Sequence, residues 1–270
     1  MPALERVQHP CGVVTYRSAL LARHGFAHAF STRHGGVSPA PFDSMNLGIA
    51  QAPGEPDTGA NVAANAARLM AAIGAPPDSM VRVRQVHAAG VHACGGAERF
   101  GEPAVEADAV VSVHPPCAPC VRTADCVPVL VACARTGAAA AVHAGWRGIV
   151  AGVVVRAVEA LAAASGAPAA GFVAAIGPCA GRDLYEVGPD VAREFAAAAG
   201  EAFVLPPGGG RRKEHIDCFG AVRAQLRAAG IPDAAIDGEE LCTIAGAADF
   251  FSYRRDGARG GRLGAVIVPR

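Results

Sequence analysis

Short apolar runs, each bounded by glycine, proline or aspartate, recur along this chain and limit the folds open to it. Apolar runs of this length between turn residues are typical of buried strands. They cover residues 109–113, 127–132, 138–143, 171–176 and 263–268, and a further strand is expected at 80–83. Between and around them, apolar residues at helical spacing predict helices over residues 61–73, 148–164, 189–199 and 219–229. Strands and helices in this irregular order predict an α+β fold.

Two stretches rich in proline and glycine, residues 51–59 and 206–213, predict loops. Neither separates segments that look able to fold independently, so we expect a single domain over residues 1–270. The N-terminal residues 1–14 lack an apolar core of signal-peptide length, and no apolar stretch is long enough to span a membrane. Nine cysteines are an odd number in a mid-sized chain, which favours reduced thiols in a cytoplasmic protein over a disulfide scaffold.

The charge balance bears on the class of partner. The 24 Lys and Arg equal the 24 Asp and Glu, so the chain lacks the strong basic field that binding to nucleic acid requires. A small neutral or locally anionic substrate fits this balance better.

Three polar segments could carry chemistry, although the chain has no sequence-local metal motif and no phosphate-binding loop. They contain His87, Cys126 and His143, residue types that zinc prefers as ligands, and three such ligands would leave one position open for catalysis. Spacing alone does not show that the three converge, and a lone His143 at a strand end is often purely structural. Asp125, beside Cys126, could be a proton carrier or a turn cap.

Nine ordered motifs spread over nearly the whole chain resemble the laccase-domain family, also called multicopper polyphenol oxidoreductase or peptidoglycan editing factor. They are Ser31-Thr32-Arg33-His34-Gly35-Gly36-Val37-Ser38, Asn46-Leu47-Gly48, Gln85-Val86-His87, Ala107-Asp108-Ala109, Thr123-Ala124-Asp125-Cys126-Val127-Pro128, His143-Ala144-Gly145-Trp146-Arg147-Gly148, Ile176-Gly177-Pro178-Cys179, Tyr185-Glu186-Val187-Gly188 and Phe251-Ser252-Tyr253-Arg254-Arg255-Asp256-Gly257.

This resemblance implies a four-layer α/β/β/α sandwich shared with the cytotoxic-necrotizing-factor type of cysteine hydrolase. It also implies a metal site made by His87, Cys126 and His143. The implied activities are the phosphorolysis of adenosine, inosine, guanosine and methylthioadenosine, and the deamination of adenosine. The expected partners are therefore a purine nucleoside and phosphate, and we expect a monomer or a small homo-oligomer.

The residues are compatible with both activities. Water at a three-ligand zinc site has a pKa lowered towards neutrality and could attack C6 of adenine, with Asp125 as the expected proton carrier. Phosphate needs cationic or N–H donors, and Arg33, Arg147 and the helix start near Gly148 are available. The family motifs add Asn46 and Gln85 to the expected substrate contacts.

The copper in one family name fits this sequence poorly. Blue-copper laccase chemistry needs about ten histidines in H-x-H clusters, whereas this chain has nine histidines and no H-x-H. Polyphenol oxidation is therefore not expected. The His, Cys, His donors would still bind Cu(II), because affinity rises towards copper in the divalent series.

Two other interpretations use the same residues. Without a metal, Cys126 could be a nucleophile activated by His143, as in cysteine hydrolases, with a peptidoglycan precursor as substrate. A non-enzymatic binding module would instead need a closed site, with Cys179 or His34 as a fourth ligand. We read Cys179 as a small buried residue, and the isolated Cys117-x-x-Cys120 pair as having no function.

Overall fold

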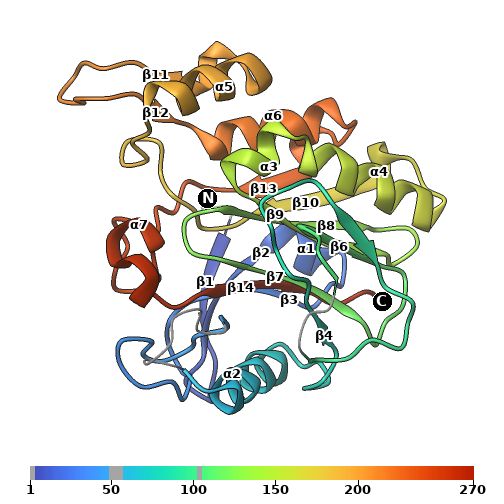
Figure 1. Ribbon diagram of the computed structural model, residues 1–270. Coiled ribbons are helices and arrows are strands. Elements are labelled where there is room, and N and C mark those ends of the chain that lie inside the picture. Colours follow the sequence, from blue (N-terminus) through green and yellow to red (C-terminus); the bar gives the residue numbers. More distant parts are fainter. Residues whose placement is uncertain (1–3, 49–56, 102–104) are drawn as a thin grey trace.

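Two six-stranded sheets stack face to face in the computed structural model, and helices cover their outer faces (Figure 1). The structure describes residues 4–48, 57–101 and 105–270. The first sheet has the order β1 (Leu4–Gln8), β2 (Val14–Ser18), β3 (His28–Ser31), β14 (Leu263–Ile267), β7 (Ala118–Thr123) and β4 (Met80–Val81). The second has the order β13 (Ile236–Gly238), β10 (Phe172–Ile176), β8 (Val127–Cys133), β9 (Ala139–Ala144), β6 (Ala109–Ser112) and β5 (Val91–Ala93).

The helices complete a four-layer α/β/β/α arrangement. Helix α2 (Gly59–Ala72) lies under the first sheet, and α3 (Trp146–Val150), α4 (Val153–Ser165) and α6 (Cys218–Ala228) lie over the second (Figure 1). The other elements are α1 (Ala19–Arg23), α5 (Pro189–Ala199), α7 (Tyr253–Asp256), the hairpin of β11 (Val204–Leu205) and β12 (His215–Ile216), and the short 3-10 turns η1 (Ala169–Gly171), η2 (Glu201–Phe203), η3 (Asp233–Ala235) and η4 (Gly257–Arg259). The expected layers are thus confirmed.

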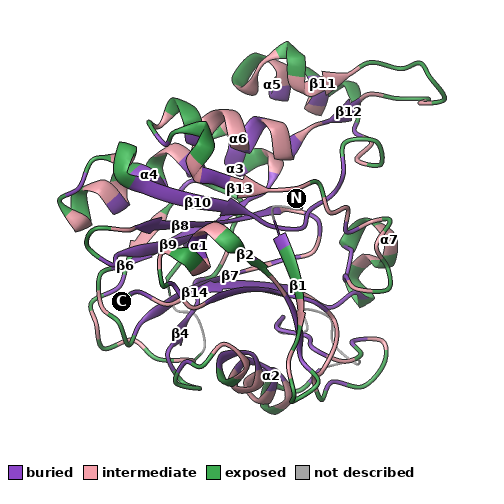
Figure 2. Cartoon of the chain, turned by 180° about the vertical axis from the view of Figure 1, so that it is seen from behind, coloured by how far each residue is buried: buried purple, intermediate pink, exposed green. Residues whose placement is uncertain are grey.

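The central strands are apolar on both faces because each face is covered, one by helices and the other by the opposite sheet. On β8, Val127, Val129 and Val131 pack against the helices, whereas Leu130 and Ala132 pack against the other sheet. Successive side chains of a strand point to opposite faces, and here both faces are covered. The central strands are accordingly buried along their length, between partly exposed helices (Figure 2).

The predicted strands and helices occur with small shifts of their ends, with two exceptions. Residues 148–164 do not form one helix, because Gly152 adopts the left-handed conformation (φ 77°) and separates α3 from α4. The strand expected at 80–83 is shorter, since β4 ends at Val81. Of the loop predicted over residues 51–59, residues 51–56 lie outside the described residues, and Gly59 already begins α2. Within the described part of the chain, no helix has the length and apolar character needed to cross a bilayer.

The Asp249 carboxylate connects the N-terminal strands to the C-terminal part of the chain. It accepts two hydrogen bonds of 2.9 Å from Arg6, one of 2.9 Å from the Tyr16 hydroxyl and one of 3.0 Å from His34 Nε2. The hydrogen bonds from Arg6, and then those from Tyr16 and His34, outweigh burial and lower the pKa of Asp249 to about 2.

Replacing Asp249 with asparagine is expected to lower the free energy of unfolding by about 2 kcal/mol at neutral pH. Because the pKa is depressed in the folded state, this stabilisation is present above the pKa of the unfolded chain and is lost as the pH falls through about 2. Urea titrations of both proteins at pH 7 and pH 3 check this. The difference between them should shrink by about half at pH 3, and a difference independent of pH would contradict it.

Candidate active site

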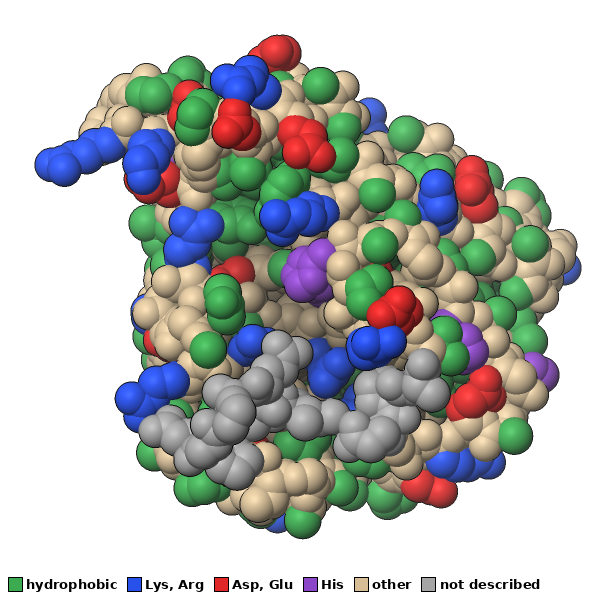
Figure 3. Space-filling view, in the orientation of Figure 1, with side chains coloured by type: hydrophobic (Ala, Val, Ile, Leu, Met, Phe, Trp, Pro, Cys, Tyr) green, Lys and Arg blue, Asp and Glu red, His purple; other side chains and the backbone are tan. Residues whose placement is uncertain are grey.

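A cavity of about 510 Å³ opens where the ends of strands from both sheets meet the loops around them. Figure 3 shows this face hollowed near its middle, with Lys and Arg side chains around the hollow. The lining residues come from seven segments of the chain, and they are Gly48, Gln85, His87, Arg122, Thr123, Ala124, Asp125, Cys126, His143, Trp146, Arg147, Tyr185, Tyr253, Arg254 and Arg262.

The chain crosses from one sheet to the other at the base of this cavity. Strand β7 ends at Thr123 in the first sheet, and β8 begins at Val127 in the second, so the tight turn between them carries Cys126. His143 lies on the neighbouring strand β9, where it pairs with Pro128. The pairing of β8 with β9 therefore places Cys126 next to His143, although they are distant in the sequence.

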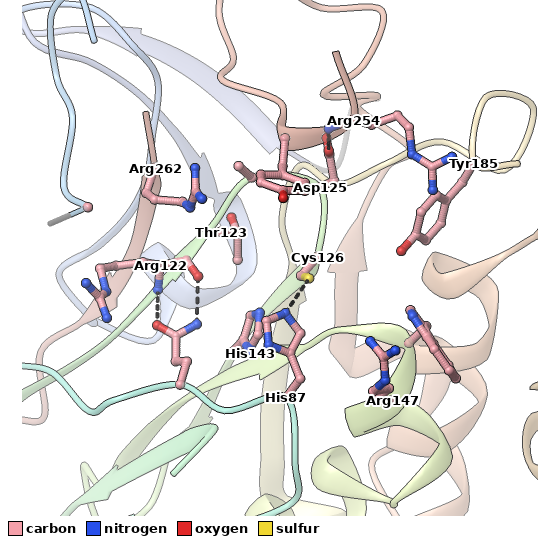
Figure 4. A pocket seen from close by; sticks show the side chains of 15 residues that line it. His87, Arg122, Thr123, Asp125, Cys126, His143, Arg147, Tyr185, Arg254 and Arg262 are labelled. Carbon is pink, nitrogen blue, oxygen red and sulfur yellow. Dashed lines mark hydrogen bonds between the residues drawn. The ribbon is translucent and has the colours of Figure 1, made fainter. Parts of the chain in front are cut away.

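His87 reaches the same point from a loop. Its Nε2 lies 3.8 Å from the Cys126 sulfur, and its ring meets the His143 ring edge to face, with centroids 4.8 Å apart (Figure 4). The ligand atoms of His87, Cys126 and His143 all lie within 4.8 Å of one another. The structure thus brings together the three residues that the sequence offered as metal ligands.

Asp108 holds both histidines in place, a role that its motif does not indicate. One carboxylate oxygen lies 2.8 Å from His143 Nδ1 and accepts from the backbone N–H of His87 at 3.0 Å, and the other accepts from Ala88 N at 2.7 Å and Val86 N at 3.3 Å. These bonds hold His87 in its positive-φ conformation (58°). They also engage Nδ1 of His143, so that Nε2 is the nitrogen left to face Cys126.

The half-buried Cys126 thiol and the buried His143 imidazole favour their charged forms. Burial raises the pKa of Cys126, but the charge of His143 and hydrogen bonds with His143 and His87 outweigh it and lower the pKa to about 6. Burial lowers the pKa of His143, but Cys126 and then Asp108 outweigh it and raise the pKa to about 9. Without a metal, both pKa shifts favour the Cys126 thiolate and the His143 imidazolium.

The donor set fits zinc. Ideal tetrahedral coordination at the usual bond lengths separates ligand atoms by about 3.3–3.6 Å, and the 3.8 Å between Cys126 Sγ and His87 Nε2 is close to this. The glycine at position 145 keeps the space beside His87 and Cys126 open. A Cβ added to Gly145 would lie 2.9 Å from His87 Cδ2 and 3.0 Å from the Cys126 sulfur, which is too close. A carboxylate behind a ligating histidine, as Asp108 stands behind His143, is the usual support of such sites. The arrangement leaves room for a substrate atom or water as a further ligand.

Asp125, next to the thiol, is held firmly in the turn. Its carboxylate accepts 2.6 Å hydrogen bonds from the Thr243 hydroxyl and from Arg254 N, and its backbone has a φ of 94°. Asp125 therefore ties the Cys126 turn to the start of α7 while it lines the cavity.

Four arginines give the cavity a positive character, and Figure 4 shows them on two sides of Cys126. On one side, the Arg147 guanidinium carbon lies 4.3 Å from the centroid of the Trp146 ring, and that of Arg254 lies 5.0 Å from the centroid of the Tyr185 ring. Arg122 and Arg262 lie on the other side. Among the described residues, the Arg147 side chain stacks on Trp146 but makes no hydrogen bond or ion pair, so its guanidinium donors are available to a ligand. Sequence reasoning missed Tyr185, Arg254, Arg122 and Arg262, although the first two stand in motifs quoted above.

The four residues expected to contact substrate lie in different surroundings. Arg147 lines the cavity, and so does Gln85, but the Gln85 amide is engaged by Arg122 N and O at 2.9 and 2.7 Å. Arg33 is not among the lining residues, and it bonds to Asp43 and to the Ala247 carbonyl. Asn46, buried and also outside the lining, bonds to Gly48, Asp57 and Arg262 N.

The two residues considered as a fourth ligand stay apart from this group. His34 bonds to Asp249, and Cys179 is buried in the core, as expected. Within the described part of the chain, only His87, Cys126 and His143 form the metal-ligating group at this cavity. A closed four-ligand site is therefore not formed by these candidates.

Comparison with known proteins identifies the family of the chain. A family model described as "Multi-copper polyphenol oxidoreductase laccase" matches residues 27–270, and the chain belongs to this family. A Deinococcus radiodurans protein named purine nucleoside phosphorylase is 41% identical over 245 residues, which cover 90% of this chain and 89% of that protein. A purine nucleoside phosphorylase of Mycobacterium tuberculosis H37Rv is 41% identical over 241 residues, 88% of this chain and 89% of its own length. The crystal structure of YlmD from Geobacillus stearothermophilus superposes with a TM-score of 0.85 at 28% identity and covers both chains completely.

Proposed function

We propose that this chain is a zinc-dependent purine nucleoside phosphorylase that also deaminates adenosine. The observation that carries the proposal is the convergence of His87, Cys126 and His143 at the base of a cavity whose walls are arginines and aromatic rings. Relatives 41% identical to the chain bear the name purine nucleoside phosphorylase, which supports the substrate class. Nine free cysteines are consistent with work in the reducing cytoplasm.

In this proposal His87, Cys126 and His143 hold the zinc ion. Bound there, zinc would supply a Lewis acid that polarises a substrate oxygen or activates water. The chain's own part is to keep the ligands in place, and Asp108 does so through His143 Nδ1 and the backbone of the His87 loop. Cu(II) is the ion that the same donors would also accept.

In phosphorolysis, the aromatic residues of the cavity would contact the purine base, and its arginines would contact the phosphate. The bond between C1′ of the ribose and N9 of the purine breaks, its electron pair leaves with the base, and a phosphate oxygen forms the new bond to C1′. The base then gains a proton. Trp146, Tyr185 and Tyr253 offer flat apolar surfaces against which a purine ring could stack. Burial of Tyr185 raises its pKa, so its hydroxyl stays neutral and able to donate a hydrogen bond to the base.

The arginines are the proposed phosphate contacts. Guanidinium groups bind phosphate oxygens in pairs of parallel hydrogen bonds. Helix α3, which begins beside the cavity, spans only Trp146–Val150, so we assign the phosphate to side chains rather than to the start of this helix. Arg147, whose guanidinium has no hydrogen bond or ion pair inside the described structure, is the first candidate, and Arg254 lies on the same side of Cys126 (Figure 4).

Replacing Arg147 with alanine is expected to raise the KM for phosphate by about tenfold or more, because one charge-assisted contact contributes about 1.5–3 kcal/mol. The rate of adenosine deamination, which uses no phosphate, should change much less. Steady-state kinetics at varied phosphate check this. Arg33→Ala is the matched control, since Arg33 lies outside the lining and should leave the KM for phosphate unchanged. Equal losses in both activities of Arg147→Ala would contradict a phosphate-specific role.

Asp125 is the proposed proton carrier for deamination, where water adds to C6 of adenine and ammonia leaves. It lines the cavity beside Cys126, and the hydrogen bonds from Thr243 and Arg254 N orient it. Those same bonds also give it a positioning role for the turn.

Product analysis tests the proposed function. Adenosine is incubated with the purified protein, with and without phosphate, and the products are separated by chromatography. The proposal predicts inosine under both conditions, and free adenine, together with hypoxanthine from the inosine, only when phosphate is present. The absence of any free base in the presence of phosphate and zinc would overturn the phosphorylase assignment.

A second function is favoured by one observation: His143 lies between Cys126, whose sulfur is within 4.8 Å of its ligand nitrogen, and the Asp108 carboxylate, 2.8 Å from its Nδ1. A thiolate beside an imidazolium whose Nδ1 faces a carboxylate is the arrangement of a cysteine hydrolase, which would act here on a peptidoglycan precursor. The second imidazole, His87, is not needed for that chemistry and favours the metal site. Iodoacetamide distinguishes the two, because a hydrolase thiol would react regardless of chelator, whereas a zinc ligand would react only after zinc removal.

A further inference from the structure

A second group of metal-ligating side chains lies at the edge of the second sheet, outside the cavity described above. His92 stands on β5, Cys94 follows the end of this strand, and Glu98 lies in the loop after it. The ligand atoms of these three residues lie within 4.8 Å of one another, and His92 Nε2 is 3.4 Å from Glu98 Oε1. None of the three lines the cavity at Cys126.

Local sequence explains why the three side chains meet. His92 and Cys94 are two residues apart, and such residues in an extended chain lie on the same side. The chain then turns at Gly95 and Gly96, where Gly96 has a φ of 92° that other residues rarely adopt. The Gly95 N–H donates a 2.8 Å hydrogen bond to Glu98 Oε1, which turns the carboxylate back towards the strand.

One polar atom of the group is an unsatisfied hydrogen-bond acceptor. Glu98 Oε2 is buried and, in the described structure, has no hydrogen-bond partner. A buried carboxylate oxygen without a donor is unfavourable, and a bound cation satisfies it. Cys94 is buried, at 7% exposed, and the side chains of His92 and Glu98 are 19% and 33% exposed.

We propose that His92, Cys94 and Glu98 bind a second zinc ion, separate from the one at His87, Cys126 and His143. Imidazole, thiolate and carboxylate are the three side-chain ligand types of zinc, and tetrahedral coordination separates ligand atoms by about 3.3–3.6 Å. The His92–Glu98 distance of 3.4 Å already meets this. The ion fastens the loop after β5 to its own strand and stabilises the edge of the sheet.

Zinc content of four proteins tests the proposal. Wild type, Cys94→Ser, Cys126→Ala and the double variant are stripped with chelator, reloaded with Zn²⁺, desalted and analysed for zinc. We expect about two ions per chain in the wild type, about one in each single variant and none in the double variant. Cys94→Ser should keep its nucleoside turnover, so loss of this ion is distinguishable from failure of the proposed function. Wild-type zinc content in Cys94→Ser would overturn the proposal.

Two more variants guard against misfolding of Cys94→Ser. Glu98→Gln keeps the size of the side chain and should weaken binding of the second zinc by at least about tenfold. Cys117→Ser is the matched control, because Cys117 is a buried thiol beside the same loop, bonded to the Glu98 carbonyl but not part of the ligand group. With Co²⁺ in place of Zn²⁺, the Cys126→Ala protein should still show a thiolate-to-cobalt absorption band. The double variant, which also carries Cys94→Ser, should lack this band. Absence of that band, or its loss in Cys117→Ser, would overturn the proposal.

Discussion

Replacing Cys126 with alanine is expected to remove the zinc ion of the cavity and to lower nucleoside turnover by more than about 100-fold. Loss of a group that merely supports a zinc ligand already costs about 10–100-fold, and Cys126 is a ligand itself in the proposed site. The two histidines would remain, but neutral imidazoles alone bind zinc more weakly than a set that includes a thiolate. Zinc analysis after dialysis and the rate of inosine phosphorolysis measure the two effects.

A matched control for this variant is Cys242→Ser. Cys242 is also half-buried and free, and its sulfur accepts a 3.2 Å hydrogen bond from Gly181 N that a serine hydroxyl can accept. It lies outside the lining of the cavity, so turnover should stay near that of the wild type. Unchanged zinc content and turnover in Cys126→Ala would exclude Cys126 from both the metal site and the chemistry.

Replacing Asp108 with asparagine is expected to weaken zinc binding at the cavity by about 10–100-fold. Each carboxylate oxygen of Asp108 accepts a hydrogen bond, so an amide NH₂ in either orientation would face a donor: His143 or His87 on one side, Ala88 and Val86 on the other. The same loss should lower the free energy of unfolding by about 1–3 kcal/mol, because a buried donor is left unsatisfied.

Zinc affinity measured by competition with a chelator, together with urea titrations, separates these two effects. Asp57→Asn is the control, because Asp57 is likewise buried and accepts hydrogen bonds from Ser38, Asn46 and Asn61, away from the cavity lining. It should lose stability but keep its zinc affinity. If Asp108→Asn lost stability alone, Asp108 would support the fold and not the metal site.

The central strands and main helices could be predicted because their patterns are local. Strand β8 and its neighbours are apolar runs bounded by turn residues, and such runs are typical of strands covered on both faces. The break at Gly152 was missed, since a single glycine within a periodic pattern does not show whether the helix continues. The pairing of β7 with β14, which brings together segments about half the chain apart, has no local signal in the sequence.

The residues of the candidate site also fall into those with a local signal in the sequence and those without one. His87, Cys126 and His143 stand out by residue type and by motif. Asp108 stands in a motif that does not indicate its role, Arg262 stands in none, and the fold brings both to the site. Arg33 and Asn46 belong to motifs as clear as those of the ligands, but their side chains hold backbone in the loops beside the cavity. A motif therefore marks a residue that the fold or the chemistry needs, and only the structure shows which of the two applies.

The most direct test of the central claim is the phosphorolysis of inosine by the zinc-free and the reloaded protein. We expect hypoxanthine and ribose 1-phosphate in equal amounts, only with phosphate present and only after zinc is restored to the stripped protein. Using the Cys94→Ser variant in parallel ensures that the effect belongs to the ion at His87, Cys126 and His143. Full turnover by the zinc-free protein, or release of the base without phosphate, would contradict the account.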